Sequence, residues 1–227
     1  MLEFLKALVL GIIQGLTEFL PVSSSGHLEL AKWVMQDDSL AAESMLMTVT
    51  LHAATALATI LVFRKDIAEI LMDLLKFKWN DGTKFAALIV ASMIPAAIIG
   101  VLFDDVLEAL FDRQIVLVAI MLIVTGLLLF LADGAKNTEK TVDWKDAVII
   151  GLAQAVAILH GISRSGATIA TSVMLGIDRE TSARFSFVIV SSVFLGKITQ
   201  DVIAGACYGH APVRELGIGF VAAVPCG

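Results

Sequence analysis

The chain is poor in charged residues, in cysteine and in any excess of positive charge. Only 17% of its 227 residues are charged, whereas 58% are hydrophobic, a balance outside the range of ordinary soluble domains. The two cysteines are too few for a disulfide framework. The formal net charge of -6 leaves no basic footprint of the kind that nucleic-acid-binding domains carry. We therefore expect an integral membrane protein with no nucleic-acid partner.

Long apolar windows support a membrane location. The windows 45–63, 85–103 and 115–132 contain no Asp, Glu, Lys or Arg. Each approaches the roughly 20 residues that a helix needs to cross hydrocarbon, so each predicts a transmembrane helix. The opening residues 1–20 could pass for a secretory signal peptide. Because Glu3 and Glu18 are unusual in such a peptide and its pattern recurs internally, we expect this segment to be retained.

A polar pattern occurs twice in the chain, at a constant offset of 140 residues. The shared positions are glycine, glutamine and serine: Gly11, Gln14, Ser23, Ser25 and Gly26, repeated as Gly151, Gln154, Ser163, Ser165 and Gly166. Membrane proteins commonly build a polar site near the middle of the bilayer from duplicated units whose apolar helices are interrupted in this way. We therefore interpret the two segments as halves of one site.

Each half has the pattern of a helical hairpin that enters the bilayer and turns back. Residues 5–21 are apolar but end in a Pro-Val-Ser-Ser-Ser-Gly break, and residues 28–35 are too short to cross; residues 147–177 repeat this design. Since three crossings separate the hairpins, the second must enter from the opposite face. The sequence predicts an all-α, polytopic membrane protein with two inverted-topology repeats, 1–135 and 146–227.

Loop charges predict the orientation of this single membrane domain, residues 1–227. Cationic residues gather in two connecting segments, Arg64, Lys65, Lys76, Lys78 and Lys84 in one and Lys136, Lys140 and Lys145 in the other. Such loops lie on the cytoplasmic side, whereas the acidic loop 104–113 would lie outside. The first hairpin should then open outward. The second repeat is about 45 residues shorter than the offset of 140 predicts, so we expect it to be incomplete.

Polar side chains around the first break could carry chemistry. Gln14 and Glu18 share one helical face, and a carboxylate buried in a membrane needs a cation, a proton or hydrogen bonds. The serines at 23–25 offer hydroxyls and backbone amides to an anion, although simple capping of a helix explains them too. His27 could exchange a proton with a reacting oxygen, or be incidental.

Arg164 is the strongest signal in the second break. A guanidinium within an apolar segment implies a buried anionic partner, and its planar fork suits the oxygens of a phosphate. Thr168 follows on the same helical face. A structural ion pair between Arg164 and Glu18 is the alternative interpretation. His52, in an otherwise apolar window, is better explained by packing or by a minor contact to the site.

The string from Gln14 to His27, together with the string from Gly161 to Thr168, resembles the undecaprenyl-diphosphate phosphatases of the bacitracin-resistance type. The resemblance implies a multi-pass enzyme of the bacterial plasma membrane, with its active site facing outward. Its partners would be membrane lipids and its substrate a C55 isoprenoid diphosphate lipid, from which it removes one phosphate to recycle the carrier for cell-wall synthesis. A homo-oligomer is compatible with it.

The resemblance also implies residue roles. Gln14 and Glu18 would hold a divalent cation, Mg or Ca. Glu18, Ser24, His27 and Arg164 would be catalytic, with Ser24 as the nucleophile or a substrate contact and His27 as the acid or base. The residues implied to bind substrate are Gln14, Ser23, Ser25, Gly161, Ser163, Ser165 and Thr168. The chain departs from the family pattern at His160, where proline is usual, at Ser191 and Ser192, and at Lys197.

Two other functions fit parts of the pattern. Inverted repeats and broken helices are also characteristic of secondary transporters, so a transporter or lipid flippase is one alternative. An inactive, truncated member of the phosphatase family is the other. The clustering of Ser24, His27 and Arg164 favours hydrolysis over passage.

Overall fold

The computed structural model describes residues 2–36, 41–76, 78–111, 114–136, 138–159, 161–203 and 213–226. These segments form ten α-helices: α1 (Leu2–Phe19), α2 (Ser24–Val34), α3 (Ala41–Val62), α4 (Arg64–Leu75), α5 (Asp81–Phe111), α6 (Ile115–Asp133), α7 (Trp144–Val156), α8 (Arg164–Met174), α9 (Arg179–Ile203) and α10 (Val213–Cys226). The all-helical prediction is confirmed for these residues.

Two of these helices are long and apolar enough to cross a membrane. They are Asp81–Phe103 within α5 and Ile115–Asp133; α3 and α4 together add a bent pair with an angle of 75°. In α6 the side chains of Val116, Ile123 and Phe130 are each more than half exposed. A continuous apolar surface of this kind is stable against lipid but not against water, so the protein is a membrane protein.

Two segments predicted as loops are helical. The cationic segment after residue 63 forms α4, and the acidic segment 104–113 is helical as far as Phe111 at the end of α5. Both predictions of a loop were wrong because charge alone does not end a helix. Outside the apolar part of a membrane, charged side chains are solvated while the backbone keeps its own hydrogen bonds.

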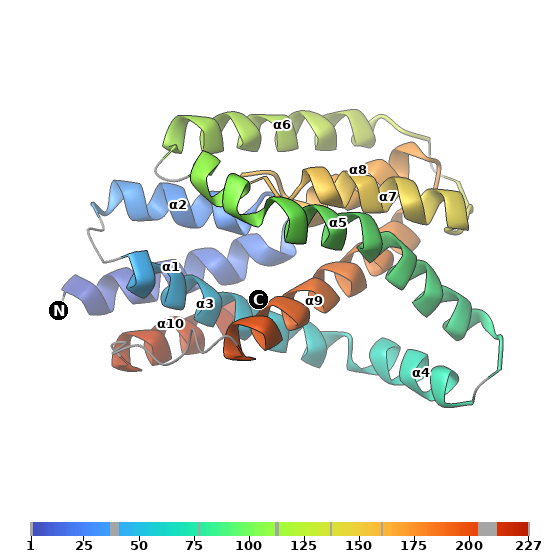
Figure 1. Cartoon of the computed structure of the whole chain (residues 1–227), viewed down its shortest axis with the longest axis horizontal. Helices are drawn as coiled ribbons and strands as arrows, with labels where there is room; N and C mark the ends of the chain where they lie inside the picture. Colours follow the sequence, from blue (N-terminus) through green and yellow to red (C-terminus); the bar gives the residue numbers. More distant parts are fainter. Residues whose placement is uncertain are drawn as a thin grey trace.

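The two short hairpins approach each other end to end. In Figure 1, α1 and α2 open toward one end of the molecule, α7 and α8 open toward the other, and the chain breaks lie between them. A methyl carbon at Gly166 would lie 2.7 Å from the carbonyl oxygen of Pro21, and one at Gly26 would lie 3.2 Å from Cα of Gly161. A side chain at Gly166 would displace the other break, and one at Gly26 would press on it and on Leu122 of α6, 2.9 Å from the added carbon.

The first helix of each hairpin packs through a glycine against another helix. A methyl carbon at Gly11 would lie 2.5 Å from the carbonyl oxygen of Gly219 in α10. At the position 140 residues later, one at Gly151 would lie 2.4 Å from the carbonyl oxygen of Ser92 in α5. Small residues permit this close approach of helix backbones, which membrane proteins use in place of the hydrophobic effect. The repeat in the sequence is therefore also a repeat in packing.

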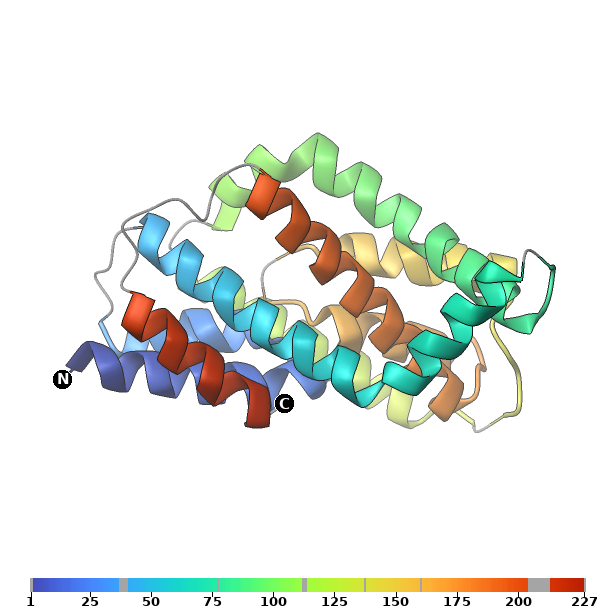
Figure 2. The ribbon, with the colours of Figure 1, turned by 90° about the horizontal axis from the view of Figure 1, so that it is seen from below.

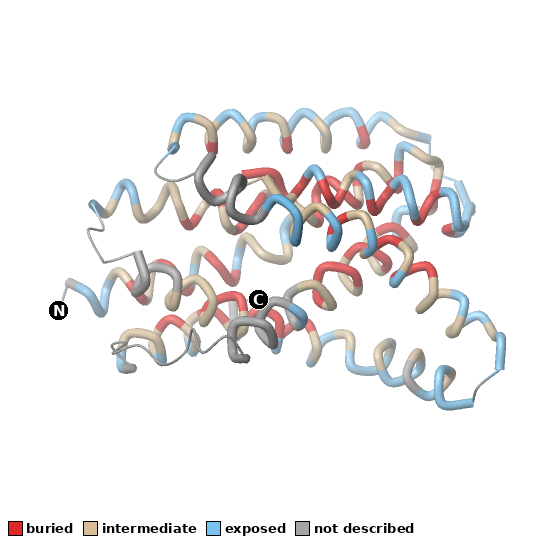
Figure 3. Tube along the Cα trace, in the orientation of Figure 1, coloured by how far each residue is buried: buried red, intermediate tan, exposed pale blue. Residues whose placement is uncertain are grey.

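The remaining helices enclose the two hairpins. α6 packs on α2 and α8 along one face, while α3 and α9 cross the opposite face, as Figure 2 shows. One buried core contains Leu10, Leu28 and Leu51, and the other contains Ile150, Ile177 and Phe185. Figure 3 shows buried stretches through the middle of the molecule, whereas α4 and much of α6 are exposed or intermediate. The polar breaks thus lie between two apolar cores.

Candidate active site

The first break brings Gln14, Glu18 and Ser24 together. Oε2 of Glu18 accepts hydrogen bonds from Ser24 Oγ, at 2.5 Å, and from Gln14 Nε2, at 2.8 Å. Gln14 Nε2 also donates to Thr55 Oγ1 of α3, at 3.1 Å, and Gln14 is fully buried. The Gln14 amide, which is itself bonded to Thr55, therefore holds the Glu18 carboxylate against the Ser24 hydroxyl. A carboxylate bonded to a serine hydroxyl is placed to accept its proton, which is what a serine nucleophile requires.

The neighbouring serines shape the start of α2. Ser23 has a φ of 69° and its hydroxyl oxygen caps the helix by accepting from the backbone N–H of Gly26, at 3.3 Å. The Ser25 hydroxyl lies 3.4 Å from that of Ser23. Nδ1 of His27 lies 2.8 Å from the Ser23 carbonyl oxygen, so it must be the protonated ring nitrogen. This leaves Nε2 of His27 as the nitrogen that can exchange a proton.

The second break uses the same cap. The Ser163 hydroxyl oxygen accepts from the backbone N–H of Gly166, at 3.0 Å, and lies 3.2 Å from the Ser165 hydroxyl. The backbone N–H of Ser163 donates to Thr125 Oγ1 of α6, at 3.0 Å. Gly161 has a φ of 94°, a conformation that strains any residue with a side chain. In the structure Gly161 and Ser163 therefore fix the path of the backbone, and any contact with a substrate stays a prediction.

Thr168 and Arg164 are the other two polar residues of α8 that the sequence predicted for the site. Thr168 is fully buried, and its hydroxyl lies 2.5 Å from the Ser186 hydroxyl of α9. Arg164 is half-buried as the first residue of α8, and its guanidinium is within electrostatic range of the Glu18 carboxylate. The structure thus brings the charged residues of both breaks into one site. Glu18 and Arg164 supply its negative and positive poles.

Three polar residues of this site were not predicted from the sequence: Thr55, Thr125 and Ser186. Each comes from a long helix outside the hairpins and bonds to a residue of one of the two hairpins. A signal was available at Thr125, which is the only hydroxyl residue in the apolar window 115–132. His52 of α3 is buried and lies within electrostatic range of Glu18 and Arg164, so it belongs to the surroundings of the site.

The residues present fit a divalent cation that prefers oxygen ligands. The carbonyl oxygen of the Gln14 side chain is buried and has no hydrogen-bond partner, and it belongs to the residue that bonds to Glu18. Carboxylate, amide and hydroxyl oxygens are the ligands that Mg and Ca prefer. No group of three His, Cys, Asp or Glu side chains suited to a metal occurs in the described part of the chain, so amide and hydroxyl oxygens would have to complete the ligand set.

The three places where the sequence departs from the family pattern all lie in the second repeat. His160 falls outside the described residues, and so does the side chain of Lys197. Ser191 and Ser192 are described, and their hydroxyls donate to the carbonyl oxygens of Phe187 and Val188 one turn earlier in α9. These bonds satisfy both hydroxyls within their own helix, so neither serine introduces an unpaired polar group.

Comparison with known proteins agrees with the geometry. Residues 7–227 match the family model described as bacitracin resistance protein BacA. A protein of Christiangramia forsetii named undecaprenyl-diphosphatase is 55% identical over 227 residues, covering 100% of this chain and 86% of the relative. Proteins of the same name from Bacteroides fragilis and Geobacter metallireducens are 42% and 41% identical, covering 100% and 96% of this chain and 86% and 84% of those relatives. The chain belongs to the BacA family.

Proposed function

We propose that the protein hydrolyses undecaprenyl diphosphate to undecaprenyl phosphate and inorganic phosphate, and so recycles the lipid carrier for cell-wall synthesis. The relatives named above carry the name of this activity. The observation that supports the proposal most directly is the bond of 2.5 Å from Ser24 Oγ to Glu18 Oε2, with the Arg164 guanidinium within electrostatic range. A base, a hydroxyl and a cation at one place suit phosphoryl transfer, in which charge stabilisation is the main requirement.

The proposed reaction transfers the terminal phosphoryl group to an oxygen nucleophile. Glu18 accepts the Ser24 proton as Ser24 Oγ bonds to the terminal phosphorus, and the bond from that phosphorus to the bridging oxygen breaks. Undecaprenyl phosphate leaves with the bridging oxygen. Water then hydrolyses the phosphoserine, which releases inorganic phosphate and restores the hydroxyl. In the direct route a water molecule, deprotonated by Glu18, attacks the same phosphorus and gives the same products.

Arg164 and His27 complete the proposed machinery. The Arg164 guanidinium would form bidentate hydrogen bonds to two phosphoryl oxygens, which a lysine could not do. Nε2 of His27 would exchange a proton with the leaving oxygen, since Nδ1 is held by the Ser23 carbonyl. Gln14 and Glu18 would hold Mg or Ca, through the unpartnered amide oxygen and the carboxylate. A bound cation of this kind supplies positive charge that neutralises the diphosphate.

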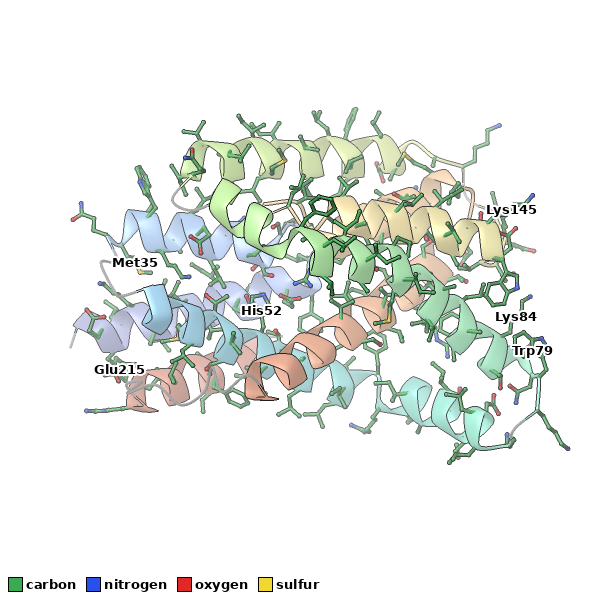
Figure 4. All side chains as sticks on the ribbon, viewed as in Figure 1. Met35, His52, Trp79, Lys84, Lys145 and Glu215 are labelled. Carbon is green, nitrogen blue, oxygen red and sulfur yellow. The ribbon has the colours of Figure 1, made fainter. Side chains whose placement is uncertain are left out.

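We also propose that the two hairpins are re-entrant and form inverted-topology repeats, 1–135 and 146–227, with the site facing outward. In support, the hairpins open toward opposite ends of the molecule in Figure 1. The repeated glycine contacts and serine caps agree with a duplicated unit. The outward orientation is supported by Lys84 of α5 and Lys145 of α7, which Figure 4 labels at the end away from the mouth of the α1–α2 hairpin.

Phosphate release by the purified protein in detergent tests the function. Wild type should release phosphate from a C55 isoprenoid diphosphate, and Glu18→Ala and Arg164→Ala should each reduce the rate at least 100-fold. Acid quenching with labelled substrate distinguishes the two routes, because a phosphoserine that Ser24→Ala abolishes requires covalent attack. Release that neither substitution changes would reject this site. No release from folded wild type would favour the transporter or the inactive relative.

A further inference from the structure

A second cation, Lys32, lies on α2 beyond the catalytic serine. Its side chain is only 12% exposed, and its Nζ donates to Thr48 Oγ1 of α3, at 3.0 Å, as well as to Glu29, at 3.1 Å. The Glu29 side chain is 45% exposed. A half-exposed carboxylate holds a partner weakly, because water screens the attraction between the two charges. A stronger anion can therefore displace Glu29 from Lys32.

Thr48 joins Lys32 to His52. Its hydroxyl accepts from Lys32, while its carbonyl oxygen accepts from Nδ1 of His52, at 2.8 Å. His52 is buried one turn further along α3, and the charges of Glu18, Arg164 and Lys32 all act on it. Figure 4 labels His52 near the middle of the molecule and Met35 at the end of α2. Lys32, Thr48 and His52 thus form a polar path between the catalytic centre and that end.

The length of this path separates it from the diphosphate site. Lys32 follows Ser24 by two turns of α2, and a rise of about 1.5 Å per residue puts their Cα atoms about 12 Å apart along the axis. Thr48 precedes Thr55, which contacts Gln14, by a similar distance along α3. The two phosphoryl groups of a diphosphate share one oxygen. The second phosphoryl group of a substrate bound at Ser24 therefore covers only part of this distance.

We propose that Lys32, Thr48 and His52 form a second phosphate site, which receives inorganic phosphate as it leaves the Ser24 centre. This inference rests on the proposed phosphatase function. Inorganic phosphate is a mixture of monoanion and dianion at neutral pH and is attracted to Arg164, so a second cation on its path favours its release from the centre. Lys32 supplies that charge, and Thr48 and His52 supply hydrogen-bonding groups. Once phosphate has dissociated, Lys32 pairs with Glu29 again.

Lys6 provides a matched control. It pairs with Glu3 at the same spacing of three residues, and its side chain is 14% exposed, close to the value for Lys32. Lys6 lies on α1, two turns before Gln14. Lys6→Gln and Lys32→Gln therefore remove the same charge from similar surroundings, but only Lys32→Gln removes it from the proposed path.

Two measurements on the full-length protein in detergent test the inference: product inhibition by inorganic phosphate, and broadening of the phosphate signal in phosphorus NMR, which needs no turnover. Lys32→Gln should raise the inhibition constant about tenfold, the effect of one charge-assisted hydrogen bond, and should reduce the broadening. Lys32→Arg should restore both, Lys6→Gln should match wild type, and the KM for the lipid should change less than twofold in Lys32→Gln.

Several results would overturn the inference. An unchanged inhibition constant in folded Lys32→Gln would show that Lys32 does not bind phosphate. An equal rise of the inhibition constant in Lys32→Gln and Lys6→Gln would show that the effect comes from net charge. A raised KM with unchanged phosphate inhibition would assign the bound group to the lipid substrate rather than to the product. Wild type could broaden the phosphate signal more than Lys32→Gln does and yet fail to hydrolyse the lipid. That result would support the phosphate site and reject the proposed enzyme function.

Discussion

Ser24 donates its hydroxyl hydrogen to Oε2 of Glu18 across 2.5 Å, although the two residues lie on different helices separated by a break in the chain. This bond orients the serine oxygen, and in the proposed mechanism the same carboxylate accepts the serine proton. The same carboxylate oxygen accepts from Gln14, so its position does not depend on Ser24. The break between α1 and α2 is what allows both groups to reach one point.

Ser24→Ala and Ser25→Ala should differ sharply in activity. Ser24 carries the hydroxyl bonded to the base, whereas the Ser25 hydroxyl lies 3.4 Å from that of Ser23. We expect Ser24→Ala to lower kcat about 1000-fold and Ser25→Ala to lower it less than tenfold. Steady-state phosphate release measures both. Equal effects of the two substitutions would mean that the hydroxyls act together in binding an anion.

Removal of divalent cations should abolish activity. The metal concentration that restores activity should depend on which residue occupies position 14. We expect Gln14→Leu to raise the Mg concentration for half-maximal activity by about 10- to 100-fold, because the unpartnered amide oxygen is lost. Gln154→Leu is the control, since it removes an amide oxygen that is also buried and unpartnered but belongs to a residue that does not bond to Glu18. A chelator that leaves the wild-type rate unchanged would contradict the assignment of a metal to Gln14 and Glu18.

Thr125→Val should weaken the second break. Thr125 Oγ1 accepts from the backbone N–H of Ser163, and the loss of a buried partner leaves that N–H unpaired at a cost of about 1–3 kcal/mol. Thr59→Val is the matched control, because the Thr59 hydroxyl bonds to the carbonyl oxygen of Thr55 within its own helix. Thermal unfolding in detergent should show a lower Tm for Thr125→Val alone. Similar values for both variants would show that Thr125 contributes only its volume.

The sequence was most informative where the chain is irregular. The repeated serines and glycines predicted both breaks, and the structure has matching caps at Ser23 and Ser163. Such features are local, since a cap is formed by residues three apart. The partners Thr55, Thr125 and Ser186 could not be predicted in this way. Their contacts depend on how long helices pack against the hairpins, and the composition of one apolar helix does not specify which of its faces meets which neighbour.

α4 was missed for a different reason. Its cationic residues were interpreted as loop charges, yet Ile67, Ile70, Leu71 and Leu74 recur with the spacing of an amphipathic helix. Positive charge and helical periodicity are compatible where a helix lies at the edge of a membrane. Counting charges placed this segment on one side but could not reveal its backbone conformation.

Acid should remove a stabilising contribution from two helix caps outside the membrane. Backbone N–H groups hydrogen-bond to the carboxylates of Asp143 and Asp178, from Asp146 and Thr181 respectively, and lower the pKa of each. A carboxyl whose pKa is lower in the folded state stabilises the fold above its ordinary value, near 4, and loses this effect as the pH falls through the lowered pKa. Tm of wild type should therefore exceed that of Asp178→Asn at neutral pH, and the difference should shrink below about pH 4. A difference that does not depend on pH would exclude the carboxylate charge as its source.

Gly166→Ala should disrupt the meeting of the two breaks. The added methyl carbon would lie 2.7 Å from the carbonyl oxygen of Pro21, so one break must move away from the other. We expect a loss of about 1–3 kcal/mol in the free energy of unfolding and a lower rate of phosphate release, because Ser24 and Arg164 lie beside these two positions. Gly126→Ala, in α6, is the control, since nothing lies within 4 Å of its methyl position and alanine favours a helix. If Gly166→Ala retained full activity and stability, the two breaks would not need the close contact, and the proposal that they form one site would lose its main geometric support.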